Sequence, residues 1–115
     1  MAKTLRHFLF AAALFSFAGA ARAEPDAKTV RLWRAKCASC HGADGNGKTE
    51  QGEKMGVSDM TSAAWQKKTT DDAIKKAILD GKKAEGKTEG MDPYKDSLSA
   101  EQIDALAAHV RTLAK

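Results

Sequence analysis

The chain has 115 residues, with 19 Lys and Arg against 15 Asp and Glu, and a formal net charge of +4. Three basic residues, Lys3, Arg6 and Arg22, lie in an N-terminal leader, so the 92 residues that follow carry 16 basic and 15 acidic side chains. This length is that of one small domain. Because the net charge after the leader is only near +1, the overall charge gives no reason to expect a nucleic-acid partner.

The leader has the composition of a secretory signal peptide. Residues 8–20 are an uninterrupted run of apolar and small residues, and Ala21-Arg22-Ala23 fits a small-x-small cleavage site. The alternative is a retained membrane anchor, but a transmembrane helix needs about 20 apolar residues. We therefore predict a cleaved signal peptide at residues 1–23, export to the periplasm, and one domain at residues 24–115 without a membrane span.

The first predicted helix, Ala27–Lys36, leads directly into the string Cys37-Ala38-Ser39-Cys40-His41. Two thiols at this spacing can each bond a different vinyl group of one porphyrin, and the next residue places an imidazole under the iron. The chain contains no other cysteine. The string therefore predicts one covalently bound haem c held by Cys37, Cys40 and His41. A redox-active dithiol is the alternative, but that motif belongs to a βαβ context, of which the sequence gives no sign.

The middle of the chain alternates loops with short helical segments. Residues 42–56 contain five glycines and are predicted to form a loop. A short helical turn is expected at residues 62–67 around Trp65. Thr70 is the predicted N-cap of a helix at Asp71–Asp80 that ends at Gly81, and residues 82–90 are predicted to form a second loop.

The last predicted helix has the strongest helical pattern. Ser99 and Gln102 match a capping box, and Leu98 can form a hydrophobic staple with Ile103. From Ile103 onward, apolar residues recur on one helical face; they are Ile103, Leu106, Val110 and Leu113.

We predict an all-α fold in which three to five helices wrap around one covalently attached haem. No segment shows the alternating pattern of a strand. After the leader, Trp33, Trp65 and Tyr94 are the only aromatic residues, which is little core for a small domain. Such small domains need an additional stabilising element. The haem would be that element, because it supplies a large apolar surface against which the helices pack.

The iron needs a second axial ligand if the protein is to transfer electrons without binding small molecules. The candidates are Met55, Met60, Met91 and His109. Met91 is favoured, because it follows a long loop and precedes a proline that stiffens the backbone. Met55 and Met60 are expected to pack, and His109, at the edge of the apolar face of the last helix, is expected to be packed or half-exposed.

Several segments together resemble a class I mono-haem bacterial cytochrome c of the small periplasmic carrier type. They are Trp33 four residues before the first cysteine, Cys37-Ala38-Ser39-Cys40-His41-Gly42, Gly42-Ala43-Asp44-Gly45-Asn46-Gly47, Asp59-Met60-Thr61-Ser62 with Trp65, and Met91-Asp92-Pro93-Tyr94 running into the last helix. The resemblance covers essentially the whole chain after the leader.

The resemblance implies a role for each matching residue. Cys37 and Cys40 would form thioether bonds, His41 would be the proximal iron ligand and Met91 the distal one. Trp65 matches a position whose indole N–H can donate to a haem propionate, with core packing as the alternative. Tyr94 would close the methionine loop over the haem, by packing or as a hydrogen-bond donor.

The sequence departs from the family pattern at three places. Asp92 separates Met91 from the proline that usually follows it directly. Thr29 and His109 stand where a glycine and an aromatic residue usually meet at the crossing of the first and last helices, which predicts a modified contact there. No proline lies in residues 42–60 to offer its carbonyl to the His41 ring, so another backbone carbonyl is expected to orient it.

These features predict a one-electron carrier of the periplasm and not an enzyme. Its expected partners are redox proteins that dock transiently at the haem edge, with Lys82 and Lys83 among the candidate contacts, and the chain is expected to be a monomer. The alternative is a haem protein with an open sixth position, which binds small ligands or acts on peroxide. Peroxide chemistry would need a distal base or arginine, and the arginines after the leader lie on the first and last predicted helices.

Overall fold

The structure is a computed structural model that describes residues 13–14 and 26–115. The predicted signal peptide and its cleavage site lie outside the described residues, apart from residues 13–14, and stay predictions. Within the described part of the chain, no helix has both the length and the apolar character needed to cross a membrane.

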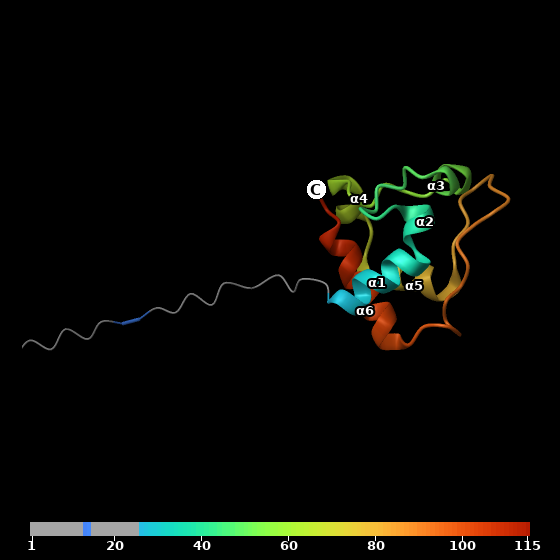
Figure 1. Cartoon of the computed structure of the whole chain (residues 1–115). Coiled ribbons are helices and arrows are strands. Elements are labelled where there is room, and N and C mark those ends of the chain that lie inside the picture. The colour runs from blue at the N-terminus through green and yellow to red at the C-terminus, as the bar shows by residue number, and fades with distance from the viewer. Residues whose placement is uncertain (1–12, 15–25) are drawn as a thin grey trace, which may run out of the picture.

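The described residues form six helices and no strand (Figure 1). The helices are α1 (Ala27–Lys36), α2 (Ala38–His41), α3 (Glu50–Met55), α4 (Ala63–Lys68), α5 (Asp71–Asp80) and α6 (Ala100–Thr112). The all-α class is therefore confirmed, with one helix more than the predicted three to five.

Two helices, α2 and α3, were not among the predicted ranges, and α3 lies inside the predicted loop at residues 42–56. The Thr49 hydroxyl accepts a hydrogen bond from the Gly52 N–H and caps the helix, as N-cap side chains commonly do. Glu50 and Glu53 lie in the first turn and Lys54 in the last, which suits the helix dipole. The predicted loop is thus wrong for these six residues, because local capping outweighs the glycine content.

The other helices begin and end close to their predicted positions. Thr70 caps α5 and Gly81 follows it, as predicted. The Ser62 hydroxyl caps α4 at Trp65 N–H. The capping box of α6 forms in both directions, with the Ser99 hydroxyl accepting from Gln102 N–H and the Gln102 side chain accepting from Ser99 N–H.

Helix α6 is the centre of the packing, because it contacts both α1 and α5. Where α1 meets α6, Thr29 and His109 are both buried, each 6% exposed. The predicted crossing of the first and last helices therefore forms with threonine and histidine in it.

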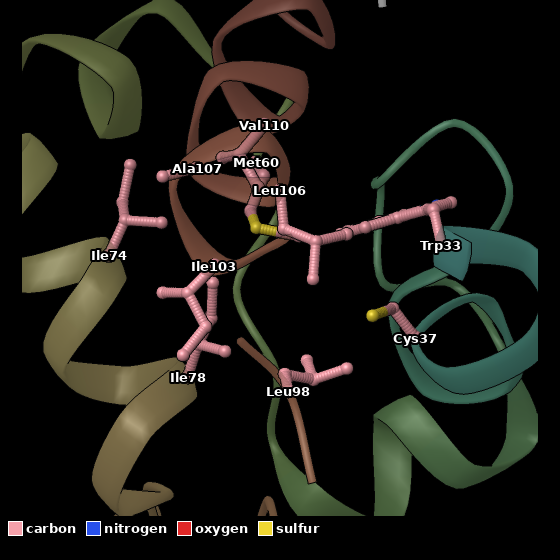
Figure 2. Close-up of a cluster of buried hydrophobic side chains, with 10 residues drawn as sticks. All are labelled: Trp33, Cys37, Met60, Ile74, Ile78, Leu98, Ile103, Leu106, Ala107 and Val110. Atoms are coloured by element: carbon pink, nitrogen blue, oxygen red, sulfur yellow. The ribbon is translucent and has the colours of Figure 1, made fainter. Parts of the chain in front are cut away.

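The buried apolar side chains come from both sides of α6 (Figure 2). Ile74 and Ile78 of α5 lie on one side of the cluster, and Trp33 and Cys37 lie on the other. Leu106, only 1% exposed, lies between them. Trp33, Ile74, Ile78 and Leu106 line one cavity, which Cys37, at the end of α1, also lines.

Candidate functional site

The cysteine string continues α1 through a short second helix. Cys37 N–H donates to the Trp33 carbonyl at 2.8 Å, and His41 N–H donates to the Cys37 carbonyl at 2.9 Å. Cys37 is buried and Cys40 is half-buried. The backbone from α1 to His41 is therefore a continuous series of helical hydrogen bonds, which fixes the two thiols and the imidazole relative to one another.

The carbonyl groups at the end of this string all have donors from elsewhere. The Thr49 hydroxyl donates to the Cys40 carbonyl at 2.6 Å, and Gly47 N–H donates to the His41 carbonyl at 2.8 Å. The indole N–H of Trp33 donates to the Gly42 carbonyl at 3.1 Å. Because helix ends otherwise leave such carbonyls unpaired, these bonds hold the string against the loop that follows it.

One cavity lies between the string, α5, α6 and the segment around Met91. The space between its walls amounts to about 1090 Å³, including the part that is open to solvent. Its walls are largely apolar and are formed by Trp33, Cys37, His41, Met55, Gly56, Val57, Ser58, Met60, Trp65, Thr69, Ala73, Ile74, Ala77, Ile78, Lys82, Ala84, Gly90, Met91, Tyr94, Leu98, Leu106 and Val110.

Five of the six predicted site residues line this cavity. They are Cys37, His41, Trp65, Met91 and Tyr94, drawn from three separate segments of the chain. Cys40 is not part of the wall; its Sγ lies 3.8 Å from the Met55 Sδ. The structure therefore brings the predicted residues to one place, while the bonds and ligation assigned to them stay predictions.

Burial keeps two side chains of the string, Cys37 and His41, in their neutral forms. Desolvation raises the pKa of the Cys37 thiol to about 11. Desolvation also lowers the pKa of His41 below its usual value, so the imidazole is neutral and has a free lone pair. A neutral imidazole is the form that binds a metal ion.

The His41 ring lacks the backbone acceptor that was predicted for it among the described residues. Its Nδ1 is buried and has no hydrogen-bond partner among the described residues, so the expected backbone carbonyl does not receive it. The ring lies against Trp33, with the centroids 5.8 Å apart and the planes tilted by 33°.

Met91 is held by a pair of backbone hydrogen bonds to Lys82. Met91 N–H donates to the Lys82 carbonyl at 2.7 Å, and Lys82 N–H donates to the Met91 carbonyl at 3.1 Å. Gly81, with φ of +75°, permits this approach, because a Cβ there would collide with the Met91 carbonyl. Tyr94 N–H donates to the Ile78 carbonyl at 2.9 Å, so the segment carrying Met91 is fastened to the end of α5.

The other candidate side chains have identifiable surroundings. Tyr94 packs against the core, and its hydroxyl donates to the Lys36 carbonyl at 3.2 Å, next to Cys37. Trp65 is half-buried and packs against the same core. Met60 is 6% exposed and belongs to the core. His109 is buried against Trp33, with ring centroids 5.0 Å apart, which agrees with the predicted packed histidine.

Sequence reasoning missed a polar network that supports the wall of the cavity. The Gln66 amide donates to the Met60 carbonyl at 2.7 Å and to the Val110 carbonyl at 2.9 Å. Arg111 donates to Gln66 and to the Thr69 carbonyl, and pairs with the Asp71 carboxylate at 2.7 Å. Gln66 and Arg111 are 45 residues apart, and no local pattern links them. Because its guanidinium has these partners, Arg111 is held outside the cavity wall.

The residues present fit a c-type haem. The cavity is apolar, it is lined by a buried thiol and a neutral imidazole, and a thioether from a distant segment completes the set. In the described part of the chain, no three His, Cys, Asp or Glu side chains are grouped so as to hold a bare metal ion. This set of donors suits an iron that is bound within the large apolar ring of a haem.

Comparisons with known proteins point to the same group. The family model described as "Cytochrome C oxidase, cbb3-type, subunit III" matches residues 24–110. The solved structure named "KustC0563 c-type cytochrome" is similar at 37% sequence identity and a TM-score of 0.68, over 76% of this chain and 98% of that one. A solved structure of a mutant of Kustc0563 gives 38% identity and a TM-score of 0.63, over 74% and 96% of the two chains. A search of curated proteins found no match.

Proposed function

The chain belongs to the c-type cytochromes, in the family described as cytochrome c oxidase, cbb3-type, subunit III, and we propose that it is a periplasmic one-electron carrier with His41 and Met91 as axial iron ligands. A cytochrome c domain of this kind serves haem-based electron transfer. The pair of ligands, the location and the shuttling between partners are the parts that we propose.

One observation carries the proposal: His41 and Met91, which are 50 positions apart in the sequence, line the same apolar cavity together with Cys37. Each of the two has its backbone fastened by hydrogen bonds, His41 within α2 and Met91 against Lys82. Ligands that are held in place before and after electron transfer suit a carrier, because little has to move when the iron changes its charge.

Each residue has a distinct task in this proposal. When bound, the haem supplies one-electron cycling between ferric and ferrous iron. Cys37 and Cys40 would hold it through thioether bonds, and His41 would offer a neutral imidazole. The Met91 thioether is a soft donor that favours the ferrous form and raises the reduction potential relative to a second histidine. The apolar wall would limit the access of water to the site.

Partners are proposed to be redox proteins that dock transiently against the open side of the cavity. Lys82 lines that cavity, and Lys83 is exposed beside it. Such an interface would be small, as is usual for electron-transfer encounters. We propose that the protein acts as a monomer and performs no chemistry on a substrate.

Replacing Met91 with alanine tests the assignment of the distal ligand. The purified holoprotein should show a weak far-red absorption band in the ferric form and no reaction of the ferrous form with carbon monoxide. In Met91→Ala the haem should stay covalently attached, the far-red band should disappear, and carbon monoxide should bind.

Met60→Ala is the matched control, because Met60 lines the same cavity but is expected only to pack. It should lower stability by about 2–5 kcal/mol, as large-to-small core substitutions do, and keep the far-red band. Unchanged ligation in Met91→Ala would show that the ligand is wrong. Ready binding of carbon monoxide by the wild type would favour the alternative, a small-ligand or peroxide-reactive haem protein.

A further inference from the structure

Trp33 contacts the cysteine string at both of its ends. Its main-chain carbonyl accepts from Cys37 N–H at 2.8 Å, where the string begins. Its indole N–H donates to the carbonyl of Gly42 at 3.1 Å, directly after His41. One residue, through its main chain and its side chain, therefore closes a ring of hydrogen bonds around the five residues from Cys37 to His41.

The Trp33 side chain also contacts the imidazole. The ring centroids of Trp33 and His41 are 5.8 Å apart, with the planes tilted by 33°. Metal-binding histidines are usually oriented by a hydrogen bond from the second ring nitrogen. The His41 Nδ1 is buried without such a partner among the described residues, and the observed contacts that can set the imidazole plane are the Trp33 ring and the Gly42 peptide that Trp33 holds.

Trp33 is itself held firmly from the other side. It is 4% exposed, and the ring of His109 on α6 lies 5.0 Å away, tilted by 54°. Tilted ring pairs at such distances are favourable. Helix α6 therefore supports Trp33, and Trp33 supports the turn that carries His41.

We propose that Trp33 is the positioning residue of the proximal histidine: it sets the plane of the His41 imidazole by clamping the Gly42 peptide and packing against the ring. This inference rests on the proposed role of His41 as an iron ligand. It assigns the orienting function to an aromatic side chain, where the sequence led us to expect a backbone carbonyl.

The variant Trp33→Phe tests the proposal, because it keeps an aromatic ring and removes the donor to Gly42. In the ferric holoprotein, the haem-methyl NMR shifts report the orientation of the axial ligand plane. We expect their pattern to change in Trp33→Phe and the midpoint potential to shift.

Ile103→Val is the matched control, since Ile103 is 3% exposed on α6 but does not line the cavity. It should lower the thermal midpoint as Trp33→Phe does, and leave the methyl pattern and the potential at the wild-type values. A Trp33→Phe protein with the wild-type pattern and potential would overturn the positioning role.

A second measurement keeps the proposal testable if Trp33→Phe yields no holoprotein. The indole N–H of Trp33 in the wild-type holoprotein should exchange with solvent at least about tenfold more slowly than in the unfolded chain, because a buried hydrogen bond protects it. Exchange at the unfolded rate would overturn the clamp. If the wild type lacks the spectrum of a histidine-ligated haem, the proposed function fails; if it has that spectrum and Trp33 is unprotected, only the positioning role fails.

Discussion

At the scale of single residues, His109 is the most unusual side chain of the core. It is buried where α1 meets α6, and neither of its ring nitrogens has a hydrogen-bond partner among the described residues. Desolvation lowers the pKa of His109 below its usual value. The folded protein therefore holds this histidine in the neutral form, and the packing against Trp33 depends on that form.

The stability of the protein should fall in mild acid because of His109. The unfolded chain binds a proton at this histidine near about pH 6.5, whereas the folded protein binds it only at lower pH. The His109 contribution is thus fully present above about pH 6.5 and is lost as the pH falls towards the folded pKa. His109→Phe should keep the aromatic contact and flatten this dependence.

Denaturant unfolding of both holoproteins at about pH 5 and about pH 8 measures the effect. The comparison with wild type subtracts the other titrating groups, which both proteins share. If the difference in stability between the two proteins is the same at both pH values, the neutral histidine is not the cause.

At the scale of elements, each of the three long helices begins at a side-chain cap. α1, α5 and α6 have ten to 13 residues each, and every one begins at a side chain that accepts from a backbone N–H in the first turn: Asp26, Thr70 and Ser99. Helices this short are marginal alone in water, so the capping bonds and the contacts of α6 are needed together.

Replacing Ser99 with alanine should lower the free energy of unfolding by about 1 kcal/mol, because it removes the acceptor for Gln102 N–H and half of the capping box. Thr88→Ala is the control, since Thr88 is exposed and lies in the loop before Met91. Thermal or denaturant unfolding of the two holoproteins measures the difference. An equal, negligible effect of both substitutions would show that the cap does not limit the stability of α6.

Local patterns such as these caps are the part of the fold that could be predicted from the sequence. The bounds of α1 and α5 and the capping box of α6 follow from local patterns, and they agree with the structure. Helix α3 was missed because Gly52 reads as a loop residue, whereas a Cβ there would collide with the Cys40 carbonyl; the glycine serves close packing.

At the site, short-range motifs identified segments that line the cavity, whereas the long-range contacts could not be identified from the sequence. The cysteine string and the segment around Met91 could be recognised from neighbouring residues. The contact of Trp33 with Gly42 and the network of Gln66 and Arg111 could not, because each depends on how separate segments fold together. The partner of the His41 ring was mispredicted for the same reason.

At the scale of the whole molecule, the core is arranged around a cavity instead of being closed on itself. Buried side chains from α1, α5 and α6 face that space from different directions. Apolar walls without a filling group lose the contacts that packed cores gain. The bound haem is therefore expected to contribute a large part of the stability of this small domain.

Replacing both Cys37 and Cys40 with alanine should leave little stable holoprotein after expression with the leader in place. Haem staining of the denatured protein measures covalent attachment, and circular dichroism with thermal unfolding measures the fold. Each single substitution is the matched control and should retain one thioether bond. A double variant without haem that unfolds as cooperatively as the wild type would contradict the role of the haem as a staple.

The paired backbone of Lys82 and Met91 has an evolutionary consequence. Because these two residues close the base of the segment between them, the intervening residues 83–90 form a loop whose two ends meet beside Met91. Insertions or deletions at its outer end, around the open turn at Gly86 where an added Cβ would meet nothing within 4 Å, are expected to leave the position of Met91 unchanged. Related proteins can therefore differ in the outer surface of this loop while the position of Met91 stays the same.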